Sequence, residues 1–287
     1  MRLLGEAFDT LTAEFTALPH IANPREKAAL VLDIAGDYSR EDLVTMRDEP
    51  LDAETITRLE SVLASAKAGT PLAYALGEWY FAGRLFFITP DVLIPRPDTE
   101  TLLITVLRHS VMLPRGLGIL EIGVGSGAVI VSLACELAAK EPRCVGTDVS
   151  TAALGMAARN VEAHDCDVEL REGSIFEPIA GGELFDIIIS NPPYIEPSET
   201  VENSVRDFEP QLAYRVPEGL PGTHYHQLIA EGSRAHLTEG GMLAMEVGAS
   251  QAQEVTLIMR VLGYTEVSIT KDLAGIGRAV SGIWRKS

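Results

Sequence analysis

Short apolar segments recur along the chain from about residue 95, and stretches with helical spacing separate most of them. Seven of these segments are expected to form strands, near residues 117, 143, 166, 185, 241, 264 and 278. Strands that alternate with helices predict a mostly parallel sheet with both faces covered. The segments 264–269 and 278–284 have no helix between them, so we expect them to form an antiparallel pair at the edge of the sheet.

The first part of the chain has a different pattern, that of short helices. Asn23-Pro24 places a capping residue before a proline at the first helical position. A second helix start is expected at Ser39, and a longer helix from Asp52 to Lys67. The aromatic segment from Trp79 to Ile88 predicts a hairpin. The chain is therefore expected to have three parts: a helical domain for substrate recognition at 1–75, a β-hairpin linker at 76–94 and an α/β domain at 95–287.

Composition and charge restrict the class of protein. The chain has 287 residues, 46% of them hydrophobic and 22% charged, which is enough for the cores of two domains. With 23 basic and 41 acidic residues, the net charge is −18. Because binding to a phosphate backbone requires the opposite sign, this balance disfavours nucleic acid and suits a basic protein partner.

Several features predict a cytoplasmic protein that contacts no membrane and binds no metal. The segment Met1–Asp9 has acidic residues where a signal peptide would be apolar, and no stretch approaches the roughly 20 apolar residues of a membrane span. Cys135, Cys144 and Cys166 form no C-x-x-C pair and are expected to be core thiols in a reducing compartment. The pair His224-x-His226 has no partner motif for a metal, which favours a position on a helix surface.

A glycine-rich loop follows the apolar stretch 117–120 and precedes a helical pattern. Glycines between a strand and a helix allow a ligand to approach the backbone closely. The acid Asp148 ends a second strand about 20 residues further on, where it can accept hydrogen bonds from ribose hydroxyls. The spacing also matches a dinucleotide fingerprint, but an acid at the head of the loop suits the ammonium group of S-adenosylmethionine. The candidate cofactor-binding residues are Glu121, Gly123, Val124, Gly125, Ser126, Gly127 and Asp148.

The segment Asn191-Pro192-Pro193-Tyr194 directly follows the buried strand expected at 185–190. The two prolines keep the backbone extended and have no N–H group. The Asn191 side-chain oxygen and the Pro192 carbonyl can accept the two hydrogens of a substrate NH2 group, with the Tyr194 ring against its plane. An exocyclic base amine and a carboxamide both fit this arrangement. We therefore expect Asn191 and Pro192 to be catalytic and all four residues, including Pro193, to bind substrate.

Five segments in this order resemble the HemK/PrmC family of peptide chain release factor glutamine methyltransferases. They are 71–78, 92–100, the glycine loop, 191–195 and 271–275. The resemblance implies a Rossmann-like S-adenosylmethionine-dependent methyltransferase sheet with an N-terminal helical bundle. It also implies methylation of the side-chain amide nitrogen of the glutamine in the Gly-Gly-Gln loop of release factors. The family's cofactor contacts further include Asn191 and an aromatic residue 15 positions before it, which is Phe176 in this chain.

The chain also departs from the family pattern, and three alternatives stay open, one of them a noncatalytic S-adenosylmethionine-binding module, which is compatible with the glycine loop. Glu121 stands where the family usually has Asp, Phe176 where many members have Trp, and 214–219 replaces a glycine-rich continuation. DNA and RNA amine methyltransferases share the Asn-Pro-Pro-Tyr segment without the Ile94–Glu100 motif, which makes them the first alternative. An NAD-dependent oxidoreductase is the second, but it would leave 191–194 unexplained.

Overall fold

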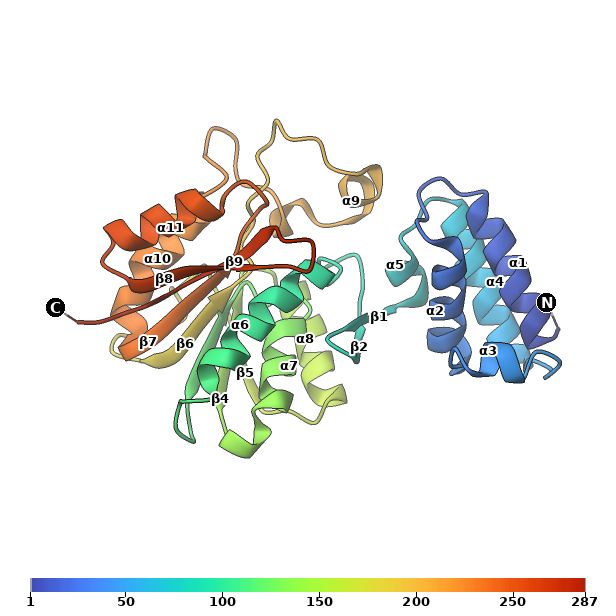
Figure 1. Ribbon diagram of the computed structural model, residues 1–287, viewed down its shortest axis with the longest axis horizontal. Helices are drawn as coiled ribbons and strands as arrows, with labels where there is room; N and C mark the ends of the chain where they lie inside the picture. Colours follow the sequence, from blue (N-terminus) through green and yellow to red (C-terminus); the bar gives the residue numbers. More distant parts are fainter. Residues whose placement is uncertain (1, 287) are drawn as a thin grey trace. The chain divides into compact units, whose positions relative to one another are not determined.

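The computed structural model describes residues 2–286, and its chain divides into two units. One unit is formed by the segments up to Trp79, Ile88–Pro90 and Val201–Phe208. The other is formed by Tyr80–Phe87, Asp91–Thr200 and the segment from Glu209 onward. The first unit is helical, and the second contains the large sheet (Figure 1).

The helical unit packs apolar side chains from several short helices into its own core. Leu4, Leu11, Phe15, Leu32 and Leu59 are all fully buried there. The helices are α1 (Leu4–Thr16), α2 (Pro24–Gly36), α3 (Asp42–Thr45), α4 (Ala53–Lys67), α5 (Leu72–Leu76) and α9 (Asn203–Phe208).

Helix α4 confirms the helix expected at 52–67, because the Asp52 side chain caps it by accepting a hydrogen bond of 2.8 Å from the Thr55 amide. Helix α2 begins at Pro24 as expected, but the capping role of Asn23 was wrong. The Asn23 backbone is left-handed, with φ of 53°, and its side chain makes no capping hydrogen bond. An N-cap side chain reaches the helix amides from an extended backbone, which Asn23 does not have.

The predicted hairpin consists of β1 (Glu78–Phe81) and β2 (Arg84–Phe87). Ala82 and Gly83 form its turn with φ of 48° and 75°. Two positive φ values in a two-residue turn match the right-handed twist of the flanking strands.

All seven expected strands form one sheet with the order β5-β4-β3-β6-β7-β9-β8. Strands β3 to β7 pair in parallel. Strand β9 pairs antiparallel with both β7 and β8, which confirms the expected antiparallel edge. The strands are β3 (Gly118–Ile122), β4 (Arg143–Asp148), β5 (Val168–Glu172), β6 (Phe185–Ser190), β7 (Leu237–Glu246), β8 (Thr265–Lys271) and β9 (Gly277–Ile283).

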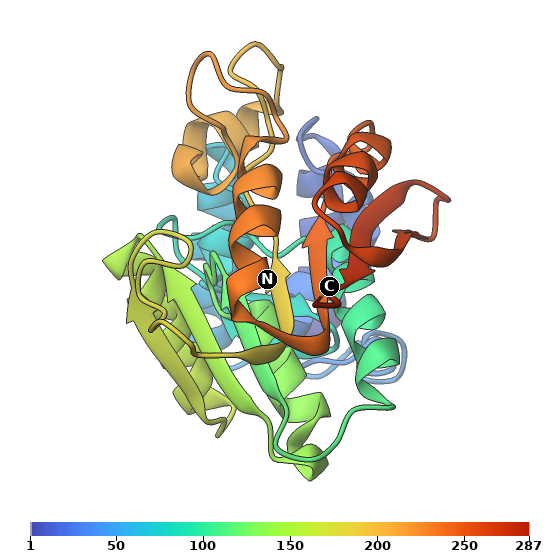
Figure 2. The ribbon, with the colours of Figure 1, turned by 90° about the vertical axis from the view of Figure 1, so that its left-hand side faces the viewer.

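The order of the strands in the sheet determines which face each connecting helix covers. Helices α7 and α8 connect β3 to β4 and β4 to β5, whereas α10 connects β6 to β7 in the opposite direction. Right-handed connections therefore put α7 and α8 on one face and α10 on the other; α10, in orange, runs alongside the strands in Figure 2. The helical segments of this unit are η1 (Pro97–Thr99), α6 (Glu100–Ser110), α7 (Ala128–Glu136), η2 (Ala138–Lys140), α8 (Thr151–Ala163), η3 (Gln211–Ala213), α10 (His224–His236) and α11 (Ala252–Val261).

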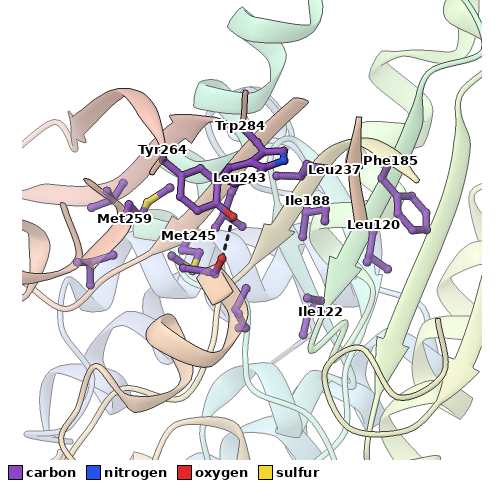
Figure 3. Close-up of a cluster of buried hydrophobic side chains, with 14 of the residues drawn as sticks. Leu120, Ile122, Phe185, Ile188, Leu237, Leu243, Met245, Met259, Tyr264 and Trp284 are labelled. Atoms are coloured by element: carbon purple, nitrogen blue, oxygen red, sulfur yellow. Dashed lines mark hydrogen bonds between the residues drawn. The ribbon is translucent and has the colours of Figure 1, made fainter. Parts of the chain in front are cut away.

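A hydrophobic cluster fills the space between the sheet and helices α10 and α11 (Figure 3). Alternate residues of the central strands, such as Leu120, Ile188 and Leu243, contribute to it. Tyr264 and Trp284 extend the cluster toward the edge strands, and the Tyr264 hydroxyl donates a 2.9 Å hydrogen bond to the Ala230 carbonyl (Figure 3).

The three cysteines are free thiols. Cys144 is buried, as expected, and its burial raises the pKa of the thiol to about 12. Cys135 and Cys166 are only partly buried, so the expectation of core thiols was wrong for these two; their Sγ atoms lie 3.2 Å apart. No helix within residues 2–286 is long and apolar enough to cross a membrane.

Substitution of Ile188 by alanine is expected to lower the free energy of unfolding of the sheet unit by about 2–5 kcal/mol, because it leaves a cavity in a close-packed core. The chain has two tryptophans, so Trp79→Phe leaves Trp284, itself in the cluster, as the only tryptophan, which can be excited selectively at about 295 nm. Urea unfolding in that background measures the effect. Val261→Ala, at a position that is 78% exposed, serves as the control and should change stability by less than about 0.5 kcal/mol.

Candidate functional site

The strand register gathers the candidate residues at one edge of the sheet. Ile122, at the end of β3, lies opposite Thr147 of β4 and Ser190 of β6. The residues that follow these strands therefore meet at the carboxyl edge, where open α/β sheets bind their ligands. A cavity of about 270 Å³ lies there, with Glu121, Gly123, Asp148 and Asn191 in its wall.

Most of the predicted site residues line this cavity. From the glycine loop these are Glu121, Gly123, Val124, Gly125 and Ser126, joined by Asp148, Asn191, Pro192 and Pro193. Gly127, Phe176 and Tyr194 do not line it. Gly127 is instead the N-cap residue of helix α7, where its φ of 81° favours glycine.

The glycine loop leaves room for a ligand beside its backbone. Gly123 and Gly125 have φ of 75° and 52°, and a Cβ atom added at either would meet no atom within 4 Å. Side chains there would therefore extend into open space. Both the backbone conformation and this space explain why these positions hold glycine.

The amide groups of the loop are largely used by the protein itself. Gly123 and Val124 donate to the Thr147 carbonyl at 2.8 and 2.9 Å, and Gly125 donates to Asp148 Oδ2 at 2.9 Å. Ile130, in the first turn of α7, donates its amide to Glu121 Oε2 at 2.8 Å. A carboxylate thus occupies the helix N-terminus where a dinucleotide would place its pyrophosphate, which argues against a dinucleotide ligand.

Glu121 is a buried acid in the cavity wall, with 3% of its surface exposed. Burial raises the pKa of its carboxyl well above the usual range, and the nearby charge of Asp148 adds to this, although the Ile130 amide acts in the opposite direction. A cationic ligand group would stabilise the charged form. The site therefore suits a ligand that carries a positive charge near Glu121.

Asp148 is held rigidly at the end of β4. Its Oδ2 accepts from Gly125 and its Oδ1 accepts from the Ser150 amide, both at 2.9 Å. Each carboxylate oxygen can accept a further hydrogen bond. Asp148 is thus suited to binding hydroxyl groups in the cavity.

Asn160 of helix α8 supports the loop from behind and was missed in the sequence. Its side chain is fully buried, and Nδ2 donates to the carbonyls of Ser126 and Phe87 at 2.8 and 3.0 Å. Its Oδ1 accepts from the Phe87 amide at 2.8 Å. Asn160 therefore ties the glycine loop to strand β2. An amide within a helical pattern gave no sequence signal of this contact.

The Asn191 side chain is oriented by Thr99. Asn191 Nδ2 donates to Thr99 Oγ1 at 3.3 Å, so its amide oxygen is the group available to a ligand. The backbone of the loop is anchored further along, because the amides of Tyr194 and Ile195 both donate to the Tyr214 carbonyl, at 3.2 and 2.9 Å. Asn191 and Pro192 both line the cavity, and their roles in binding the substrate and in catalysis stay predictions.

Two aromatic rings lie differently from the expectation. The Tyr194 hydroxyl donates to Glu246 Oε1 at 3.3 Å, and burial raises the pKa of the phenol. The Phe176 ring stacks on His236 with centroids 5.1 Å apart, while the preceding residue, Ile175, lines the cavity. Neither ring reaches the cavity wall in this structure, so ligand contacts by Tyr194 and Phe176 stay predictions.

Other polar residues near the site were not among the candidates. The buried Glu209 side chain accepts from the Ile94 amide at 3.1 Å and pairs with Arg96, which lines the cavity. The sequence signal for Arg96 was its place in the Ile94–Glu100 motif.

The surface position expected for His226 was wrong, because it is fully buried and donates from Nε2 to the Glu246 carbonyl at 2.8 Å. Within residues 2–286, no cluster of three or more His, Cys, Asp or Glu side chains could hold a metal ion.

Comparison with known proteins gives matches along most of the chain. Residues 6–77 match the model of the PrmC N-terminal domain, and residues 98–212 match that of the methyltransferase small domain. The release factor glutamine methyltransferase of Geobacter sulfurreducens is 36% identical over 273 residues, which cover 94% of this chain and 93% of the relative. The enzyme of the same name from Neisseria gonorrhoeae is 36% identical over 265 residues, covering 92% and 94%.

Solved structures support the same fold. A methyltransferase from Pyrococcus furiosus has a TM-score of 0.52 to this chain at 21% identity, covering 82% of this chain and all of that one. The expected Rossmann-like methyltransferase sheet is thereby confirmed.

Asn160→Ala should destabilise the sheet unit and loosen the glycine loop, because it leaves the carbonyls of Ser126 and Phe87 without their buried donor. Each unsatisfied group costs about 1–3 kcal/mol. Hydrogen–deuterium exchange should become faster at the amides of 123–128 than in the wild type. Asn23→Gly, at an exposed residue without a side-chain cap, is the control. Unchanged exchange in Asn160→Ala would show that Asn160 does not support the loop.

Proposed function

Since this chain belongs to the family of release factor glutamine methyltransferases, we propose that its substrate is the glutamine of the Gly-Gly-Gln loop of peptide chain release factors. The enzyme is an S-adenosylmethionine-dependent protein-glutamine methyltransferase. The observation that carries the substrate proposal is the Asn191 amide, which Thr99 holds beside a cavity that also contains Glu121 and Asp148. An oxygen acceptor for a substrate NH2 group beside the expected cofactor residues supports this proposal.

The residues of the cavity fit the cofactor. The buried carboxylate of Glu121 would bind the ammonium group, and Asp148 would accept hydrogen bonds from the ribose hydroxyls. The open space beside Gly123 and Gly125 allows the ligand to approach the loop backbone. When bound, S-adenosylmethionine supplies a methyl group that its sulfonium makes electrophilic.

The weakness of the nucleophile determines what the protein must do. The lone pair of a carboxamide nitrogen is delocalised into its carbonyl, and no ordinary side-chain base removes its proton beforehand. Asn191 Oδ1 and the Pro192 carbonyl would accept the two amide hydrogens, which fixes the direction of the nitrogen and increases its electron density. Alignment of two bound reactants can contribute roughly 7–11 kcal/mol to the rate.

The two alternatives fit this chain less well. An amine of a nucleic-acid base could bind Asn191 in the same way, but the net charge of −18 opposes binding of a phosphate backbone. An NAD-dependent oxidoreductase would need the N-terminus of α7 for pyrophosphate, and Glu121 occupies that position. A Gly-Gly-Gln loop in a protein avoids both difficulties.

The substrate proposal predicts that a release factor, incubated with methyl-labelled S-adenosylmethionine and this enzyme, acquires label on its Gly-Gly-Gln glutamine. A release factor with that glutamine changed to glutamate should acquire none. Asn191→Ala should lower the single-turnover rate by about 10²-fold or more, because alignment is lost, while Asn23→Gly should be unaffected. Label on DNA or RNA in parallel incubations, with none on the release factor, would support the nucleic-acid alternative instead.

The cofactor assignment of Asp148 makes a separate prediction. Asp148→Ala should weaken S-adenosylmethionine binding by about 1.5–3 kcal/mol, the range for hydrogen bonds to a charged group. Isothermal calorimetry measures this, with the exposed Asp167→Ala as control. Wild-type affinity in Asp148→Ala would remove Asp148 from the cofactor site.

A further inference from the structure

A buried carboxyl group lies beneath the Asn191 loop and outside the cavity. Glu246 ends strand β7 with 2% of its surface exposed. Its Oε1 accepts a hydrogen bond from the Tyr194 hydroxyl at 3.3 Å. Its Oε2 accepts no hydrogen bond from any residue within 2–286. The Thr99 hydroxyl also interacts with this carboxylate and favours its charged form. Burial of a carboxylate costs free energy, so the position of Glu246 requires an explanation.

Thr99 connects this carboxylate to Asn191. Its hydroxyl is buried and accepts the hydrogen bond from Asn191 Nδ2. A threonine hydroxyl has a single hydrogen. Glu246 Oε2 accepts no hydrogen bond within residues 2–286, and it belongs to a carboxylate that interacts with Thr99, so we assign the Thr99 hydrogen to this side. The donors are then ordered in one direction, from Asn191 to Thr99 and from Thr99 to Glu246.

We propose that Glu246 is a positioning residue that acts through Thr99 and, as a carboxylate, keeps the Asn191 amide oxygen directed at the substrate. This inference rests on the proposed function, in which that oxygen accepts a hydrogen of the substrate carboxamide. Glu246 touches neither substrate nor cofactor. Its role is to determine which end of the Asn191 amide the substrate meets.

Protonation of Glu246 would reverse this order. A protonated carboxyl can donate to Thr99, and the Thr99 hydrogen then points toward Asn191. The Asn191 amide must turn over to accept it, which presents an NH2 group to the NH2 group of the substrate. Two donors would face each other, and the acceptor needed for alignment would be lost.

The surroundings of Glu246 place this change near neutral pH. Burial raises the pKa of Glu246 to about 7, Asp98 adds to the rise, and the side chains of Thr99 and Tyr194 and the charge of Arg278 oppose it. Arg278 is itself paired with Asp98 and Asp272, each at 2.9 Å. A further titratable neighbour is His226, which donates to the Glu246 backbone carbonyl and whose pKa is lowered by burial.

Activity and stability should therefore respond to pH in opposite directions. The active form is the carboxylate, so methyl transfer should fall as the pH drops through about 7. The pKa of Glu246 in the folded state lies above the ordinary glutamate value of 4.5. Protonation therefore stabilises the fold, and this stabilisation is lost as the pH rises from 4.5 through 7. Glu246 would thus be least favourable for stability in the pH range in which it supports catalysis.

Glu246→Gln tests this directly, because glutamine keeps the shape but places an NH2 group toward Thr99. The single-turnover rate with saturating S-adenosylmethionine and release factor should fall about 10²-fold at pH 8, as for a misplaced reactant. The rate of the variant should be independent of pH between 6 and 8.5, whereas that of the wild type should fall about tenfold per pH unit below 7. The melting temperature of the variant should exceed that of the wild type by more at pH 8.5 than at pH 5.5. Its affinity for S-adenosylmethionine should be unchanged.

Thr99 gives a second test that does not depend on the folding of Glu246→Gln. Thr99→Val breaks the connection and should lower the rate at least tenfold, whereas Thr99→Ser keeps the hydroxyl and should restore it. Thr105→Val is the matched control, since Thr105 is also buried and its hydroxyl donates only to the Thr101 carbonyl in its own helix.

The outcomes separate this inference from the proposed function. Normal rates in Thr99→Val, or a wild-type pH profile in Glu246→Gln, together with a low rate in Asn191→Ala, would overturn the role of Glu246 alone. A normal rate in Asn191→Ala would overturn the proposed function of the loop, and the inference with it. Loss of activity in Thr99→Val with rescue by Thr99→Ser supports both.

Discussion

Strand β3 pairs in parallel with β4 on one side and with β6 on the other, and its last residue, Ile122, lies opposite Thr147 and Ser190. This register requires the glycine loop, Asp148 and Asn191 to leave the sheet side by side. The helices that follow β3 and β6 then cover opposite faces, which opens a crevice between the loops. Strand pairing thus brings together the predicted cofactor residues and the predicted substrate acceptor, and the loops need only local chemistry.

Two buried acids lie on either side of this crevice, and both destabilise the fold in their charged form. Burial raises the pKa of Glu121 and of Glu246. The first carboxylate is partly compensated by the N-terminus of α7, and the second by hydroxyl groups. Neither compensation is complete, which is typical of charged groups that are retained for a role other than packing. Glu121 lines the cavity and can bind a cation, whereas Glu246 does not line it and interacts with Thr99, which does.

How much of the structure could be predicted from the sequence depends on how far apart in the chain the interacting residues lie. The strands, the glycine loop and the antiparallel edge were predictable because their signals are local: apolar runs, glycine spacing and the absence of an intervening helix. The orientations of Phe176 and Tyr194 were not, because they depend on α10 and β7, which are distant in the sequence. The burial of His226 likewise depends on β7 packing over one face of its helix. The one local signal for Glu246 was an acid within the apolar run Met242–Val247, where a charge requires a partner.

The segment 214–219 departs from the family pattern, yet it holds the loop 191–195 in a way that tolerates this departure. The amides of Tyr194 and Ile195 donate to the Tyr214 carbonyl, and the Val216 amide donates to the Ile195 carbonyl. These are backbone groups, so they form the same bonds whichever side chains the segment carries. The two prolines have no amide hydrogen and therefore need no acceptor, and the Tyr194 hydroxyl is held by a hydrogen bond to Glu246. The loop is therefore anchored through its backbone on one side and through Tyr194 on the other, which leaves the Asn191 amide as the part of the loop whose orientation still depends on a proton.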